Sequence, residues 1–73
     1  MSIQSLDILR ARLEANVEAD SIGVEAASYR RHWTVRVMVR RGCVSVDVTG
    51  RSTALSAAVE DAVERLHDAG VDP

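Results

Sequence analysis

The sequence of 73 residues contains no phenylalanine, no lysine and a single cysteine, Cys43. One cysteine cannot form a disulfide within the chain, and no cysteine and histidine have the spacing of a zinc site. No apolar stretch approaches the roughly 20 residues of a membrane-spanning helix, and the N-terminus lacks the basic start of a signal peptide. These absences predict a cytoplasmic protein without a metal or other cofactor and without a membrane partner.

Large aromatic side chains are scarce as well, since only Tyr29 and Trp33 are present. The apolar residues are mostly valine and alanine, and a chain of this length buries only about 60% of its unfolded surface. We therefore expect residues 1–73 to form one domain with a thin core. A thin core favours self-association, because a second surface can supply the missing burial, so a homodimer is one expected arrangement.

Apolar residues at helical spacing predict two amphipathic helices, at about 5–19 and about 53–69. The first apolar stripe consists of Leu6, Leu9, Leu13 and Val17. The second consists of Leu55, Val59, Ala62, Leu66 and Ala69. Ser52 is expected to cap the second helix, and Gly70 is expected to end it.

Between these helices, alternating β-branched residues predict strands at about 22–29, 33–40 and 43–49. A turn centred on Arg41 and Gly42 would place three valine pairs opposite one another and Arg36 beside Asp47. The expected valine pairs are Val39 with Val44, Val37 with Val46, and Val35 with Val48. The predicted fold class is α+β: a three-stranded antiparallel β-meander with two helices packed on one face, in the order α-β-β-β-α.

Charge is segregated along the chain, because residues 30–51 hold six arginines against one acid, whereas both flanking segments are acidic. In the predicted topology, the loop between the first two strands lies at the same end of the sheet as the start of the second helix. Free backbone N–H groups there favour anions. The residues expected to form this anion or nucleic-acid site are Arg30, Arg31, His32, Arg51 and Ser52.

The order of helix, three-stranded meander and helix resembles the double-stranded-RNA-binding domain. The run His-Trp-Thr-Val at 32–35 and the Gly-Arg-Ser at 50–52 also look like that family. The resemblance implies contacts to duplex RNA through the first helix, the first hairpin loop and the start of the last helix. At the last position the family carries lysines, whereas residues 53–57 read Thr-Ala-Leu-Ser-Ala, so the resemblance implies the fold more strongly than RNA binding.

No catalytic constellation is visible, since the sequence lacks a supported Ser/His/Asp set, a glycine-rich phosphate loop and paired carboxylates in a cleft. We therefore expect no enzyme. Cys43 has no neighbour that would activate its thiol, and His67 is expected to be a solvated residue near a helix end.

Two functions are left open. The first is a small protein-interaction module, such as an accessory protein of a phage or mobile element that binds a host protein. Arginine, tyrosine and methionine are residue types that anchor interfaces. The candidate interface residues are therefore Tyr29, Arg30, Arg31, Met38 and Arg40. The alternative is binding of duplex RNA or DNA through the anion site described above.

Overall fold

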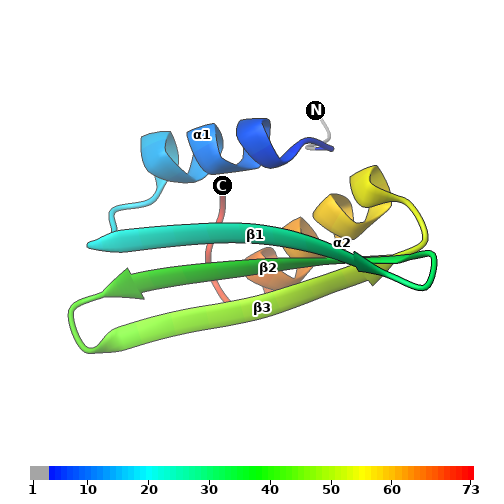
Figure 1. Ribbon diagram of the computed structural model, residues 1–73. Helices are drawn as coiled ribbons and strands as arrows, with labels where there is room; N and C mark the ends of the chain where they lie inside the picture. The colour runs from blue at the N-terminus through cyan, green and yellow to red at the C-terminus, as the bar shows by residue number, and fades with distance from the viewer. Residues whose placement is uncertain (1–3) are drawn as a thin grey trace.

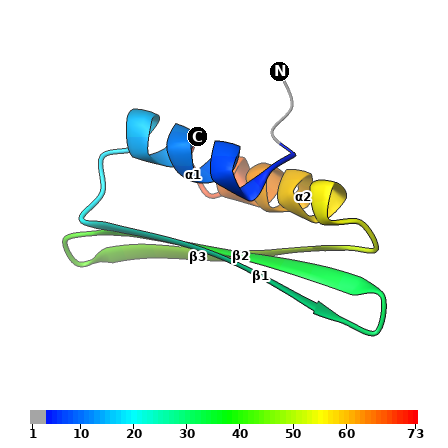
Figure 2. The same cartoon turned by 45° about the horizontal axis from the view of Figure 1, so that its top comes forward.

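A computed structural model describes residues 4–73 of the chain (Figure 1). Its elements are α1 (Leu6–Asn16), β1 (Ser21–Tyr29), β2 (His32–Arg41), β3 (Val44–Ser52) and α2 (Leu55–Asp68). The strands form one antiparallel sheet in the order β1-β2-β3. Both helices lie on the same side of this sheet, and the other side is left open (Figure 2). The structure thus confirms the predicted α+β class.

The core lies between the sheet and the two helices. Every second residue of β2 points toward the helices, which buries Val35, Val37 and Val39. The helices contribute the other buried side chains, which are Leu9, Leu13, Ala58, Val59, Ala62 and Leu66. Trp33 is only partly buried at the rim, so the core contains no fully buried aromatic ring. The core is as thin as the composition predicts.

The turn between β2 and β3 lies one residue later than predicted. Gly42 and Cys43 form it, and Gly42 has φ of 58°, which suits the first central position of a type II′ turn. As a result, β3 is shifted by two residues from the predicted pairing. Val39 now faces Val46, Val37 faces Val48, and Val35 faces Gly50. The shift keeps every side chain on its predicted face, because the side-chain period of a strand is two.

The ends of several elements also differ from the expected bounds. The first helix ends at Asn16, and β3 extends through residues 50–52 before α2 starts at Leu55. The N-cap of α2 is Ala54, which has no side-chain cap hydrogen bond, so the predicted cap at Ser52 is wrong. Gly70 adopts φ of 86° just after α2, and it ends the helix as predicted.

Candidate binding surfaces

The open side of the sheet has no covering element within residues 4–73 (Figure 2). Alternation along the strands places Arg36, Met38 and Arg40 of β2 on this face. Arg36 donates from Nε to Asp47 Oδ1 at 3.1 Å and from Nη2 to Asp47 Oδ2 at 2.6 Å. Because β3 is shifted, Arg36 lies directly opposite Thr49 and reaches Asp47 diagonally. The predicted contact therefore forms with a different register.

The Arg36–Asp47 pair is exposed to solvent, with 51% and 46% of the two side chains accessible. The hydrogen bonds between them raise the pKa of Arg36 and lower the pKa of the Asp47 carboxyl. Exposed pairs of this kind add little stability. The pair mainly cancels two charges on the open face, which leaves the other arginines of that face as its free cations.

The turn between β1 and β2 consists of Arg30 and Arg31, and both residues have positive φ, at 49° and 67°. A two-residue turn with this backbone is normally built from asparagine and glycine. A left-handed conformation costs other residues roughly 1–2 kcal/mol each. The strained backbone therefore presents two arginines at the tip of the hairpin at an energetic cost.

Beside this turn the open face has a hollow of about 480 Å³. Its lining consists of Tyr29, Arg30, His32, Thr34 and Arg51 and includes no acidic residue. Tyr29 is 72% exposed, and the guanidinium carbon of Arg30 lies 5.2 Å from the centre of its ring. The hollow combines an aromatic ring, an imidazole and two cations in one place.

The structure places the residues of the anion site predicted around the start of α2 on two different faces of the sheet. Arg51 and His32 point to the open face, opposite the side where α2 lies, whereas the partly buried Ser52 belongs to the helix-facing set. The backbone N–H of Arg51 donates to Asp61 Oδ2 at 2.9 Å, which lowers the pKa of that carboxyl. An acid of α2 thus accepts the outward N–H of Arg51.

The predicted protein-interface residues fall into two groups. Tyr29, Arg30 and Arg31 lie at the hairpin tip, whereas Met38 and Arg40 lie toward the opposite end of β2. Six residue steps separate Met38 from the strand end at His32, which corresponds to about 20 Å. Met38 extends over Gly23 of β1, where an added Cβ would lie 3.0 Å from the Met38 methyl group. The open face links the two groups.

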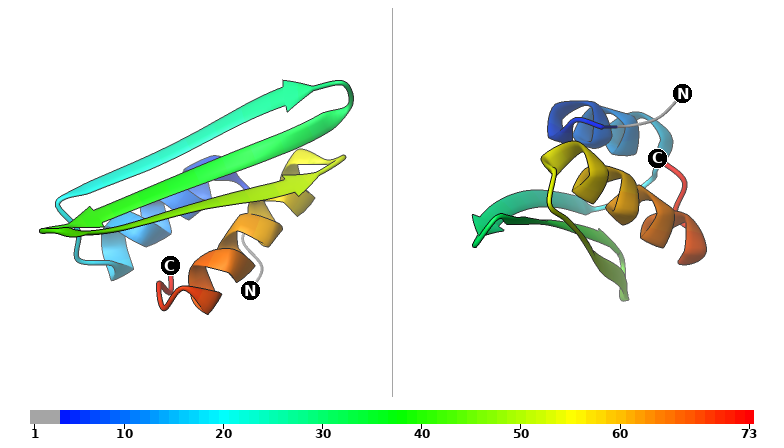
Figure 3. Two further views of the ribbon diagram at one scale, coloured as in Figure 1. Left: turned by 90° about the horizontal axis from the view of Figure 1, so that it is seen from below. Right: turned by 90° about the vertical axis from the view of Figure 1, so that its right-hand side faces the viewer.

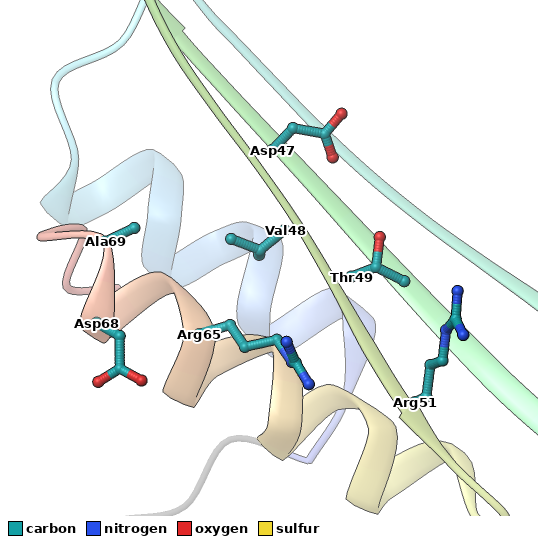
Figure 4. A pocket seen from close by; sticks show the side chains of 7 residues that line it. All are labelled: Asp47, Val48, Thr49, Arg51, Arg65, Asp68 and Ala69. Atoms are coloured by element: carbon teal, nitrogen blue, oxygen red, sulfur yellow. The ribbon is translucent and has the colours of Figure 1, made fainter.

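A hollow that the sequence pattern does not predict lies along the outer edge of β3 (Figure 4). It has a volume of about 680 Å³ and is bounded by Val48, Thr49 and Arg51 on the strand and by Arg65 and Asp68 on α2. The apolar stripe of α2 predicts which side of the helix is buried. It does not predict the angle between helix and strand that opens this hollow.

The remaining reactive side chains, Cys43 and His67, do not line either of these hollows. Cys43 is exposed in the β2–β3 turn. His67 is hydrogen-bonded to Asp72, which raises the pKa of the imidazole. Within residues 4–73, no cluster of three histidine, cysteine or acidic side chains could hold a metal ion. No helix in that range is both long and apolar enough to cross a membrane.

Comparison of the chain with known proteins finds no matching family model, curated protein or solved structure. The α-β-β-β-α topology is therefore established by the structure of this chain alone, and the resemblance to the double-stranded-RNA-binding domain stays a prediction.

Proposed function

We propose that this domain is a non-enzymatic protein-interaction module that binds its partner through the open side of the sheet. The supporting observation is the one-sided architecture, in which two helices cover one face and the other face stays accessible (Figure 2). That face carries Met38 on β2 and Tyr29 at the end of β1, and both residue types are enriched in interfaces. An accessory protein of a phage or mobile element that acts on a host protein is the setting that its size and composition favour.

The test is affinity capture with the immobilised domain, followed by identification of retained proteins by mass spectrometry. Met38→Asp places an unpaired charge on the open face, so we expect it to abolish retention of the specific partner. Ile8→Asp is the matched control, because Ile8 is 49% exposed on α1 in the opposite layer. A partner retained equally by both variants would contradict the proposal.

A second function, binding of duplex RNA or DNA, is favoured by the acid-free hollow of Tyr29, Arg30, His32, Thr34 and Arg51. Phosphate contacts from arginines release counterions, so this binding should weaken steeply as salt increases. Fluorescence anisotropy of labelled duplexes at low and at physiological salt measures it directly.

The double variant Arg30→Glu, Arg31→Glu should abolish nucleic-acid binding if the hairpin tip contacts phosphates. Arg40→Glu with Arg41→Glu is the matched control, because it makes the same charge change at the far end of β2. Absence of binding at low salt would remove this function. Equal losses of nucleic-acid affinity in both double variants would show non-specific attraction to the basic sheet.

A further inference from the structure

The outer edge of β3 carries backbone groups without partners. Arg51 donates its backbone N–H to Asp61 on α2, so this N–H points away from β2. In an antiparallel strand the backbone groups of every second residue point the same way, so those of Ser45, Asp47 and Thr49 point outward too. Within residues 4–73 no hydrogen bond to these outward backbone groups is formed, and β2 is the only strand beside β3. The edge of β3 from Ser45 to Thr49 is therefore open to pairing, whereas its end at Arg51 is bonded to α2.

The helix α2 lies beside this edge, on the covered side of the sheet. α2 runs obliquely to β3, and its C-terminal half extends past the strand on the side away from β2 (Figure 3). The hollow of about 680 Å³ lies between the two elements. Figure 4 shows Val48 pointing toward α2, with the Arg65 side chain extending from the helix toward the strand. A fourth strand placed here would pair with β3 and rest on α2.

The charges around the hollow differ between its two ends. Asp47 is engaged by Arg36, and Arg65 lies 3.3 Å from Asp61. Arg51 has no acidic partner for its guanidinium within the described chain. The end of the edge near Arg51 therefore carries an uncompensated positive charge, which complements an acidic side chain.

A second copy of the domain fits this edge poorly. In a two-fold β3-to-β3 pairing, both α2 helices would lie on the same side of the joined sheet. Each would extend past its own β3 into the space that the other helix needs (Figure 3). An extended segment without a helix of its own avoids this conflict.

We propose that the β3 edge binds an extended segment of a partner protein, which adds to the sheet as a fourth strand. Strand addition of this kind obtains affinity from main-chain hydrogen bonds and specificity from alternate side chains. The outward groups of Ser45, Asp47 and Thr49 provide up to about six such bonds. The segment carries small or apolar residues toward Val48 and α2, and an acidic residue at its end, within reach of the Arg51 guanidinium. This inference rests on the proposed protein-binding function and adds the β3 edge to the open face as a second contact with the partner.

The test begins with a display library of random linear peptides, which is selected on the immobilised wild-type domain. Selected peptides are then synthesised with a fluorescent label, and their affinity is measured by anisotropy. Thr49→Pro removes an outward N–H and fills the place of the added strand, while an edge strand tolerates proline at such a position. We expect it to weaken peptide binding at least about tenfold.

Ala26→Pro is the matched control on the other edge of the sheet. Arg10 donates to the carbonyl of Val24, so the backbone groups of Val24 and Ala26 point away from β2. This variant should bind the peptides as the wild type does. Arg51→Glu should weaken the binding of acidic peptides more than Arg40→Glu does. The Arg40 variant makes the same charge change at the far end of the open face.

Amide hydrogen exchange gives a readout that does not depend on the variants. Bound peptide should slow exchange of the Asp47 and Thr49 amides and leave those of Ala26 and Ser28 unchanged. The inference is overturned if no peptide is selected, if Thr49→Pro binds normally, or if sedimentation shows a dimer that Thr49→Pro dissociates. A captured partner that depends on Met38 and not on Thr49 would overturn this binding mode while supporting the proposed function.

Discussion

Gly50 lies where α2 crosses the sheet, and its position shows how closely the two layers approach. A Cβ added at Gly50 would lie 2.3 Å from the Ala58 carbonyl oxygen and 2.4 Å from the Ala62 nitrogen. These are backbone atoms of α2, so relief requires movement of the whole helix. We expect Gly50→Ala to lower the free energy of unfolding by about 3 kcal/mol, measured from urea unfolding curves.

Gly23→Ala is the control for this prediction, because Gly23 is also a strand glycine. Its added Cβ would meet only the Met38 side chain, whose terminal methyl group lies 3.0 Å away and can rotate. Replacing a strand glycine by alanine stabilises by roughly 0.5–1 kcal/mol where space allows. Equal destabilisation by the two substitutions would show that the backbone of α2 is not the obstacle at Gly50.

His67 reports on the C-terminal tail. Its hydrogen bond to Asp72 raises the pKa of the imidazole above its ordinary value of 6.5. A group with a raised pKa in the folded state stabilises the fold below its unfolded pKa, and this stabilisation is lost as pH rises through the folded pKa. The tail contact is therefore strongest below pH 6.5 and weakens above the folded pKa.

Titration of His67 by NMR measures this effect. Asp72→Asn should return the pKa of His67 toward its ordinary value, because it removes the acceptor and its charge. An unchanged His67 pKa in the variant would mean that Asp72 is not its partner in solution.

At the scale of elements, the β1–β2 turn is a measurable source of strain. Arg30 and Arg31 both have positive φ, so replacing the first with asparagine and the second with glycine relieves the turn. We expect the double substitution Arg30→Asn, Arg31→Gly to stabilise the domain by about 2 kcal/mol and to raise Tm by roughly 10 °C. Thermal unfolding followed by circular dichroism measures the change.

The same substitution removes two charges, so a control must separate charge from conformation. Arg30→Gln with Arg31→Gln removes the same charges but keeps side chains that strain the turn. This variant should therefore gain less stability than the Asn–Gly variant, because its turn keeps the backbone strain. If the two variants gain equally, charge repulsion at the hairpin tip and not backbone strain limits stability.

The periodicity of the sequence was sufficient to predict both helices, all three strands and the face on which each strand residue lies. The register of β3 could not be predicted in the same way, because a shift of two residues preserves every face. Gly42 selects between the registers through its place in the turn, where it adopts φ of 58°. The bond from Gly42 N–H to Asp20 Oδ2, at 2.7 Å, joins residues 22 positions apart and has no local signal.

The candidate sites were predictable to a smaller extent. The predicted topology correctly placed the β1–β2 turn and the end of β3 at the same end of the sheet, as the pairing of Thr34 with Arg51 shows. It did not show that Arg51 faces away from α2, because β3 was expected to end before residue 51. The hollow beside β3 depends on the oblique path of α2, which no periodic pattern encodes.

For the whole molecule, charge is divided between the two layers. Residues 21–52, which form the sheet and its turns, hold six arginines and two acids and carry +4. The rest of the chain holds three arginines and nine acids and carries −6. A partner that approaches the sheet side therefore meets positive charge, while the helical layer repels acidic molecules. This polarity favours the orientation in which an acidic segment reaches Arg51 from the sheet side.

The thin core also determines how the molecule unfolds. Within residues 4–73, nine buried side chains form one cluster that includes residues of both helices and of β2, so neither layer has a core of its own. A domain of this size has a total stability of only about 4–11 kcal/mol. We therefore expect one cooperative transition, with helix circular dichroism and Trp33 fluorescence changing together in urea.

Leu13→Ala tests this coupling from the helical side. Leu13 is fully buried on α1, and its truncation should cost about 3 kcal/mol. If the core is one unit, both signals should shift to the same lower urea midpoint, although Trp33 lies on β2. Ile8→Ala, at a half-exposed position of the same helix, should shift neither signal appreciably. Separate midpoints in the Leu13 variant would instead show that α1 detaches while the sheet and α2 stay folded.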